Sequence, residues 1–296
     1  MINVLYCGNS NVFDGIITSL LSIEKYYKGT INTYIFTMSA THLNDSFTAI
    51  SDEQVQFIDN MLKDTNKKSK AIKMDITDLY NSEIGGSPNE QSKYTPYALL
   101  RLFADQDKMP SDKLLYLDID VLFNDDIRKL YDIDLLDYEY AAARDHYGKK
   151  LLKRDYINSG VILFNMPKIR KTGLLKKARE LINNRQLMFA DQSAIYLCTT
   201  KKLILPQYFN DQKRLTKKTI IRHFSKTLKL TPYPRTINIK PWKVSDIHRV
   251  FHCYDFDDIL YEYIYYKKLF ERNQKNQIDK GDQNELKKRN SNIFSK

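Results

Sequence analysis

The feature that most constrains this chain is an apolar run interrupted by two carboxylates. Residues 113–123 read KLLYLDIDVLF, so Asp118 and Asp120 stand one residue apart among apolar side chains. On a strand, side chains at i and i+2 point to the same face, which would bring these carboxylates together. Two buried carboxylates repel each other and lose solvation, and a divalent cation relieves both costs. We therefore expect a strand that ends at a metal site on the edge of an open α/β sheet.

Two other interpretations of this Asp-x-Asp pattern fit the local sequence. The pattern is often a turn or a helix cap without any metal. It also resembles the first motif of haloacid-dehalogenase-type phosphohydrolases, in which Asp118 would be the nucleophile. That class needs a later Gly-Asp-x-x-x-Asp motif, whereas residues 281–286 read GDQNEL and lack the last Asp. The partners that Asp118 and Asp120 have elsewhere in the chain must decide among these functions.

Length and composition fit either one large α/β domain or a domain plus an appendage. The chain has 296 residues, of which 42% are hydrophobic, enough for a sizeable core. It has no apolar segment of 18 residues and no signal-peptide pattern, so we expect a cytoplasmic protein. Three widely spaced cysteines form neither a disulfide framework nor a zinc motif, as is usual in a reducing compartment.

The net charge of +11 is concentrated in one segment. Residues 201–243 hold 12 Lys and Arg against one acidic residue, whereas residues 1–200 hold 25 against 26. The chain lacks the helix-turn-helix, ribonucleoprotein and zinc-finger patterns, so we expect no nucleic-acid partner. The segment suits a diphosphate, or an anionic membrane with the protein peripheral on the inner face of the plasma membrane. A solvated basic face explains most of these lysines equally well.

Strand and helix patterns alternate along the chain, as in a nucleotide-binding α/β fold. No Gly-x-Gly-x-x-Gly follows the first strand, which argues against a dinucleotide site. Residues 244–270 have helical periodicity and many aromatic side chains, and residues 271–296 are polar. The expected elements are strands at 2–7, 31–38, 71–74, 113–123, 140–143, 156–166, 202–205 and 219–224, and helices at 13–27, 51–64, 97–103, 167–183 and 189–197.

The polar motifs, taken in order, resemble family 8 of the glycosyltransferases, the retaining galactosyltransferase and glycogenin-like group with the GT-A fold. The resemblance runs from residue 1 to about residue 242. It implies a Rossmann-like mixed sheet flanked by helices over residues 1–242, a helical appendage at 243–272 and a flexible tail at 273–296. The matched motifs are Arg101, YLDID at 116–120, Asp145, NSGV at 158–161, DQ at 191–192, HF at 223–224 and KPW at 240–242.

The resemblance implies metal-dependent transfer of a hexose, galactose or glucose, from a UDP-sugar to a hydroxyl of a glycan, glycolipid or glycoprotein. Asp118, Asp120 and His223 would hold Mn²⁺, or Mg²⁺ in its place; this ligand set suits Mn²⁺ better than a closed zinc site. Asp191 and Gln192 would be the catalytic residues, with Gln192 closest to the anomeric carbon. The donor would contact Cys7, Asn9, Asn11, Arg101, Asp118, Ile119, Asp120, Asp145, Asn158, Ser159 and Lys240.

The amide of Gln192 is a poor nucleophile. We therefore favour front-side attack through a short-lived oxocarbenium–phosphate ion pair, with Gln192 as polar support. A different class of function, a silent sugar-nucleotide or glycan-binding partner of another transferase, is the alternative. The intact set of Asp118, Asp120, His223 and Gln192 argues against it.

Two departures from the family pattern bear on the donor site. Asn9 or Ser10 stands where the family often has an acidic residue against the uracil; an Asn carbonyl can still accept from the uracil N–H. Residues 227–239 separate the HF and KPW motifs more widely than usual. This insertion could keep Lys240 from the phosphate, with Lys226 or Lys229 in its place, or could line the acceptor groove.

Overall fold

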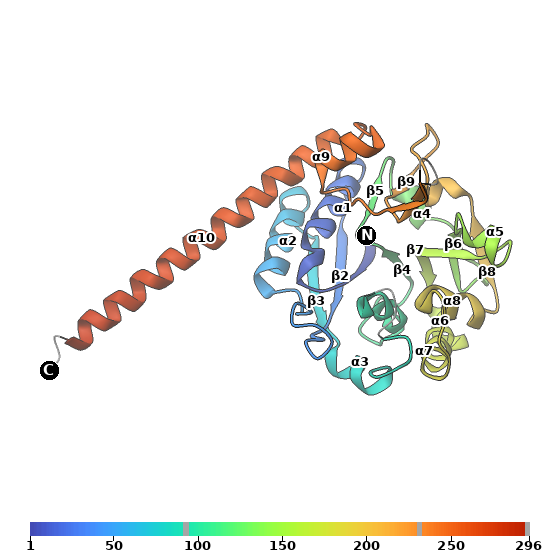
Figure 1. Ribbon diagram of the computed structural model, residues 1–296, viewed down its shortest axis with the longest axis horizontal. Helices are drawn as coiled ribbons and strands as arrows, with labels where there is room; N and C mark the ends of the chain where they lie inside the picture. Colours follow the sequence, from blue (N-terminus) through green and yellow to red (C-terminus); the bar gives the residue numbers. More distant parts are fainter. Residues whose placement is uncertain (91–94, 230–232, 294–296) are drawn as a thin grey trace.

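The computed structural model describes residues 1–90, 95–229 and 233–293, with side chains up to residue 276 except that of residue 229. Its centre is a seven-stranded sheet of order β3-β2-β1-β4-β7-β6-β8, with helices on both faces (Figure 1). Within this sheet β7 runs antiparallel to its neighbours β4 and β6, and the other pairings are parallel. The strands are β1 Ile2–Cys7, β2 Ile31–Thr37, β3 Lys70–Asp75, β4 Lys113–Leu117, β6 Tyr140–Arg144, β7 Ile157–Asn165 and β8 Lys202–Leu205.

The helices separate into two layers that bury opposite faces of the sheet. One layer contains α1 Phe13–Tyr26, α2 Asp52–Thr65, α4 Arg128–Tyr131 and the start of α10 Asp257–Ile293. The other contains α3 Thr77–Glu83, the 3-10 helix η2 Pro96–Phe103, α6 Met166–Thr172, α7 Leu174–Asn184 and α8 Ala190–Cys198. Shorter helical segments are η1 Ser10–Val12, α5 Gly148–Leu151, η3 Gln207–Phe209, α9 Val244–Asp246 and the π-helical η4 Ile247–Phe251.

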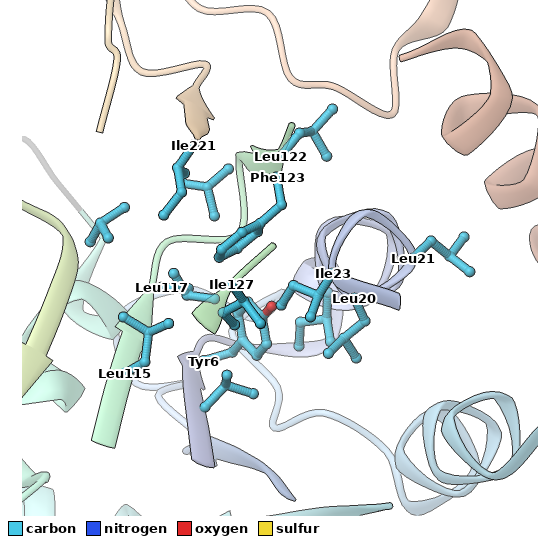
Figure 2. Close-up of a cluster of buried hydrophobic side chains, with 14 of the residues drawn as sticks. Tyr6, Leu20, Leu21, Ile23, Leu115, Leu117, Leu122, Phe123, Ile127 and Ile221 are labelled. Carbon is cyan, nitrogen blue, oxygen red and sulfur yellow. The ribbon is translucent and has the colours of Figure 1, made fainter. Parts of the chain in front are cut away.

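Alternation along the central strands supplies both cores. Leu115 and Leu117 of β4 pack in the α1 layer, whereas Leu114 and Tyr116 pack in the η2 layer. Figure 2 shows the first core, in which Tyr6, Leu115 and Leu117 lie near side chains of α1. Both faces of β4 are thus apolar, as expected of a central strand covered on both sides.

Two small two-stranded sheets flank the central one. β5 Val121–Phe123 pairs with β9 Ile221–His223, and β10 Thr227–Lys229 pairs with β11 Arg235–Ile237. The insertion noted in the sequence thus contains the β10–β11 hairpin, of which residues 230–232 lie outside the described residues. The first of these sheets continues from the Asp-x-Asp segment, so it fixes what lies beside the two carboxylates.

The predicted strands and most predicted helices are confirmed, with four corrections. β4 ends at Leu117 and β5 begins at Val121, so residues 118–120 form a turn, and strand alternation does not orient the two carboxylates. The segment that carries Arg101 is a 3-10 helix. The helix expected at 167–183 is broken at Gly173, which has φ of 66°.

The fourth correction concerns the C-terminal helix. The periodic stretch 244–270 is interrupted at His252, whose φ is 49°, and α10 begins only at Asp257. The first turns of α10 pack on α1, where Phe270 lies 4.5 Å from Phe13 between ring centroids and Lys267 pairs with Asp14 at 2.6 Å. Figure 1 shows α10 then running away from the body of the protein. The division at residues 242 and 272 stays a prediction.

Candidate active site

Polar residues gather where strand ends meet on one edge of the sheet. The parallel strands β1, β4 and β6 finish there, and the antiparallel β7 begins there. Asp118 follows β4, Asp145 follows β6 and Asn158 is the second residue of β7. The Asp118 N–H donates to the Gly160 carbonyl at 2.7 Å, which ties the turn after β4 to β7. This is the edge at which an open α/β sheet binds ligands.

Asp118, Asp120 and His223 form a cluster that could hold a metal ion. Val121 pairs with His223 across β5 and β9, so the imidazole lies beside the Asp120 turn. His223 Nε2 lies 3.2 Å from Asp120 Oδ1 and 3.6 Å from Asp118 Oδ2. One ligand atom from each of the three residues lies within 4.8 Å of the others. The turn after β4 therefore brings the two carboxylates together, and β9 places the imidazole beside them.

Gly160 of β7 leaves the space in which this cluster fits. A Cβ at this position would lie 2.3 Å from His223 Cε1 and 2.6 Å from Asp118 Oδ2. Non-bonded contacts this short are essentially never made by a Cβ atom, so any side chain here would displace the imidazole and the carboxylate. The glycine of the NSGV motif thus lets the His223 and Asp118 side chains approach the backbone of β7. It is not needed for an unusual backbone conformation, since it lies within a regular strand.

The donor set fits a divalent cation. Two carboxylates and one imidazole are ligands that Mn²⁺ and Mg²⁺ accept, and the set has no thiolate that would favour a softer metal. His223 turns Nε2 toward the carboxylates and places Nδ1 3.0 Å from Asn210 Oδ1. An imidazole whose other nitrogen is held by a fixed partner is the usual arrangement of a metal ligand.

Lys240 reaches the cluster despite the insertion before it. Its Nζ lies 2.5 Å from Asp120 Oδ2. Trp242, two residues on, packs close to Gly15 of α1, and Ile119 approaches the same glycine. Burial opposes the charge of Asp120, but the Lys240 ammonium and the His223 ring outweigh it and lower the pKa of Asp120 below its usual range.

Arg101 of η2 connects the cluster to α8 and β7. Its Nη2 donates to Asp118 Oδ1 at 3.0 Å, and its Nε lies 3.3 Å from Asp191 Oδ2. Nη1 donates to the Ser159 carbonyl at 2.7 Å, and the guanidinium lies 4.2 Å from the centroid of the Tyr116 ring. The Arg101 side chain is buried, so these contacts form in a low-dielectric setting.

Asp191 and Gln192 lie in the first turn of α8 and face the same β7 residue. Ser159 Oγ donates to Asp191 Oδ2 at 2.9 Å, and the Ser159 N–H donates to Gln192 Oε1 at 3.0 Å. Asp191 does not cap this helix, because the N-cap of α8 is Phe189, which makes no side-chain cap hydrogen bond. The carboxylate turns instead to Arg101 and Ser159, toward the site.

Asp145 and Asn158 form a second polar pair at the edge. Asn158 Nδ2 donates to Asp145 Oδ2 at 2.9 Å. Asp145 Oδ1 in turn accepts from the Gly148 N–H at 2.6 Å and from the Tyr147 N–H at 3.0 Å. The carboxylate is thus held by the start of α5 on one side and by β7 on the other.

The residues expected against the nucleobase lie after β1. Asn9 is buried and accepts from the Asn11 N–H at 3.1 Å, whereas Asn11 is exposed. Cys7 ends β1, next to β4. Burial raises the pKa of the Cys7 thiol, so the thiol stays protonated and is no nucleophile.

Two residues of the site were not singled out in the sequence. Tyr116 is buried, and its hydroxyl donates to Asp118 Oδ1 at 2.7 Å. Its place in the YLDID motif was a signal, since it lies two residues before Asp118. Asn210 contacts His223 and Asn158, but it lies in an irregular segment without a motif around it, so the sequence offered no signal.

The mixed seven-stranded sheet flanked by helices has the architecture of the GT-A fold. Residues 3–246 match the sequence model of a family described as Glycosyl transferase family 8. The chain belongs to this family, which confirms the resemblance. Of the described residues, none form a helix that is both long and apolar enough to cross a membrane.

Solved structures share the fold at low sequence identity. The galactosyltransferase LgtC, in complex with donor and acceptor sugar analogs, aligns with a TM-score of 0.61 at 20% identity, covering 81% of this chain and 89% of LgtC. The glycosyltransferase GlyE of Streptococcus pneumoniae TIGR4 aligns with a TM-score of 0.59 at 19% identity, covering 88% of this chain and 63% of GlyE. These matches establish the GT-A architecture.

Curated relatives match parts of the chain. Glycosyltransferase GlyA of Streptococcus pneumoniae serotype 4 is 30% identical over 142 residues, which are 47% of this chain and 20% of GlyA. General stress protein A of Bacillus subtilis strain 168 is 25% identical over 185 residues, 53% of this chain and 64% of the relative. The match with GlyA thus spans only a fifth of its length.

Proposed function

We propose that this chain moves a hexose, galactose or glucose, from a UDP-sugar to a hydroxyl of a glycan, glycolipid or glycoprotein, with retention and with a divalent cation. One observation carries the proposal. Asp118 and Asp120 from one turn, His223 from β9 and Lys240 from the segment after β11 converge at the ligand-binding edge of the sheet. A cation site beside an ammonium suits a nucleoside diphosphate, which is a leaving group with concentrated negative charge.

Asp118, Asp120 and His223 would hold the cation, with Mn²⁺ preferred and Mg²⁺ as a substitute. When bound, the cation supplies Lewis-acid neutralisation of the departing diphosphate. With Asp120 committed to the metal, the Lys240 ammonium becomes available to a phosphate oxygen, which it would bind by a charge-assisted hydrogen bond. Cys7 at the end of β1, Asn9 and Asn11 after it, and Ile119 would hold the nucleobase end.

The donor sugar would lie against Arg101, Asp145, Asn158 and Asp191. Each presents a hydrogen-bonding atom at the edge, where these residues already hold one another and Ser159. This preorganisation favours binding, because little side-chain freedom is lost when the sugar arrives.

The contacts of the two α8 residues support front-side attack. Gln192 Oε1, the nucleophilic atom of this amide, accepts from the Ser159 N–H, which lowers its nucleophilicity further. Asp191 is held by Arg101 and by the Ser159 hydroxyl, which lowers the nucleophilicity of its carboxylate. Both residues would therefore support the developing positive charge at the anomeric carbon by electrostatics, without a covalent adduct.

The acceptor would approach past α5 and the β10–β11 hairpin. The Leu228 N–H of the hairpin donates to the Tyr147 hydroxyl at 3.0 Å, and Tyr147 lies two residues after Asp145. Leu151, Leu228 and Tyr233 are exposed in these segments, among several lysines. Apolar and basic side chains together suit an anionic membrane surface, so we include peripheral membrane association in the proposal.

Slow hydrolysis of donors tests this function before any acceptor is known. Purified protein is incubated with UDP-, GDP- and ADP-sugars, with Mn²⁺ or with EDTA, and nucleotide release is measured for the wild type and Asp120→Asn. We expect Mn²⁺-dependent UDP release from one sugar, lost in the variant. Donor binding without release would favour a silent binding partner, and phosphate release with an adduct on Asp118 would favour a phosphohydrolase.

A further inference from the structure

We infer that Asn210 is a positioning residue that fixes the proton of His223 on Nδ1 and so presents the Nε2 lone pair to the cation. The inference rests on the proposed metal function and extends it to a residue outside the ligand set. Asn210 lies between the metal-site histidine and Asn158, and it contacts both with its side-chain amide.

The direction of each hydrogen bond follows from groups that can act in only one way. The Gly160 backbone N–H can only donate, and it faces Asn158 at 3.0 Å, so that atom of Asn158 is the carbonyl oxygen. The Asn210 atom 2.9 Å from the same oxygen must then be its amide nitrogen. Asn210 therefore turns its own carbonyl oxygen to His223 Nδ1, 3.0 Å away.

A second group fixes the same direction independently. The Asp145 carboxylate is an acceptor, and it lies 2.9 Å from the other side-chain atom of Asn158, which must be the nitrogen. Donors and acceptors thus alternate without conflict from Asp145 through Asn158 and Asn210 to His223. An amide carbonyl can only accept, so Nδ1 carries a proton, and a neutral imidazole then has its lone pair on Nε2.

The backbone around Asn210 keeps this side chain in place. Asn210 is fully buried. The next residue, Asp211, bridges to β9: its N–H donates to the Ile221 carbonyl at 2.9 Å, and its carbonyl accepts from the His223 N–H at 3.0 Å. The backbone carbonyl of Asn210 also accepts from Gln207 Nε2 at 2.8 Å. The amide is therefore oriented before any ligand binds.

Loss of the Asn210 acceptor would move the proton of the neutral His223 ring from Nδ1 to Nε2. Without it, a neutral ring gains most by placing its proton on Nε2, where Asp120 Oδ1 lies 3.2 Å away as an acceptor. That proton would stand where the cation must bind. Removing a partner that orients a metal ligand lowers metal affinity about 10- to 100-fold.

Mn²⁺ titration followed by electron paramagnetic resonance tests this, with the wild type, Asn210→Leu and Asn210→Asp. Leucine has a similar shape but no acceptor, so we expect Mn²⁺ binding about 10- to 100-fold weaker. Aspartate keeps an acceptor for Nδ1–H but loses the donor to the Asn158 carbonyl oxygen, so we expect a smaller loss of Mn²⁺ affinity than with leucine. Asn89→Leu is the matched control, because Asn89 is equally buried and bonds to the segment 182–187, away from the cluster.

Imidazole ¹⁵N resonances provide a readout that a merely structural role would not move. We expect the neutral His223 ring of the metal-free wild type to carry its proton on Nδ1, and that of Asn210→Leu to carry it on Nε2. A wild-type proton on Nε2, or equal Mn²⁺ affinity in the wild type and Asn210→Leu, would overturn the inference. If the wild type binds no Mn²⁺, the proposed function fails, and the ¹⁵N spectrum still decides the tautomer. If Asn210→Leu does not fold, Asn210→Asp and the wild-type spectrum decide.

Discussion

Lys240 Nζ lies 2.5 Å from Asp120 Oδ2, although 120 positions separate the two residues. The chain leaves the site after His223, forms the β10–β11 hairpin and returns at Lys240. Trp242 fixes the return by packing against Gly15, where a Cβ would lie 2.8 Å from the indole ring. The lengthened loop therefore adds a hairpin without moving the lysine from the carboxylate.

Replacing Lys240 with Met should reduce the free energy of donor binding more than it reduces the free energy of unfolding. The variant loses one charge-assisted hydrogen bond to the diphosphate, of about 1.5–3 kcal/mol, which corresponds to about a 10- to 100-fold rise in the Kd for UDP with Mn²⁺. Calorimetric titration of UDP measures it. Lys243→Met is the control, because Lys243 is exposed; an equal effect in both variants would contradict a specific role for Lys240.

Replacing Gly160 with Ala should disrupt the metal site. The added methyl group would lie 2.3 Å from His223 Cε1, so the ring must move away from the carboxylates. We expect Mn²⁺ affinity to fall by at least about tenfold, as for loss of ligand orientation. Gly173→Ala is the control: its φ of 66° makes alanine cost about 1 kcal/mol of stability, without contact to the cluster. Unchanged Mn²⁺ binding in Gly160→Ala would show that the cluster does not need this close approach.

Replacing Arg101 with Met should destabilise the fold by about 3–5 kcal/mol, because it leaves the Asp118 and Asp191 carboxylates without their buried partner. Urea unfolding at pH 7 measures the change. Arg128→Met is the comparison, since Arg128 pairs with Asp126 at the surface, where solvent screens the pair, and its loss should cost far less. Similar costs for the two variants would be the contrary result.

Glu24 of α1 should make stability depend on pH. Burial raises the pKa of Glu24 to about 7, with the nearby Glu262 and Asp64 adding to the rise and Thr65 and Lys28 opposing it. The folded pKa exceeds the unfolded value of 4.5, so stability is full below about pH 4.5 and falls as the pH rises through about 7.

Glu24→Gln removes this dependence, because an amide stays neutral. The variant should exceed the wild type in free energy of unfolding at pH 8, by up to about 3 kcal/mol from 1.36 kcal/mol per pKa unit, and match it near pH 4.5. Urea unfolding at both pH values measures the gap. A gap that does not change with pH would contradict the assignment to Glu24.

The sequence was sufficient to predict the sheet and to group Asp118, Asp120 and His223 as candidate ligands, whose role stays a prediction. Strands such as β1 and β4 can be recognised from their apolar runs, because both faces of a central strand are buried. His223 is far from Asp118 and Asp120 in the sequence. The three could still be grouped, because the resemblance supplied the order of motifs. Their convergence in the structure supports that part of the prediction.

Other features could not be predicted because they depend on tertiary contacts. The turn at residues 118–120 depends on the pairing of β5 with β9, which neither segment encodes alone. Helical periodicity did not show the break at His252, a single residue in a left-handed conformation. Asn210 has no periodicity or motif around it, and its importance follows only from the two side chains it joins.

The most direct test of the account is calorimetric titration of UDP into the wild type and Asp120→Asn, each with Mn²⁺ and with EDTA. Asp120 joins His223 and Lys240 at the proposed diphosphate site, so this variant removes one metal ligand with little change of shape. We predict UDP binding to the wild type with Mn²⁺ only, and none to the variant. Equal UDP binding in EDTA, or Mn²⁺-dependent binding that Asp120→Asn retains, would contradict the central claim that this cluster binds the cation and the diphosphate.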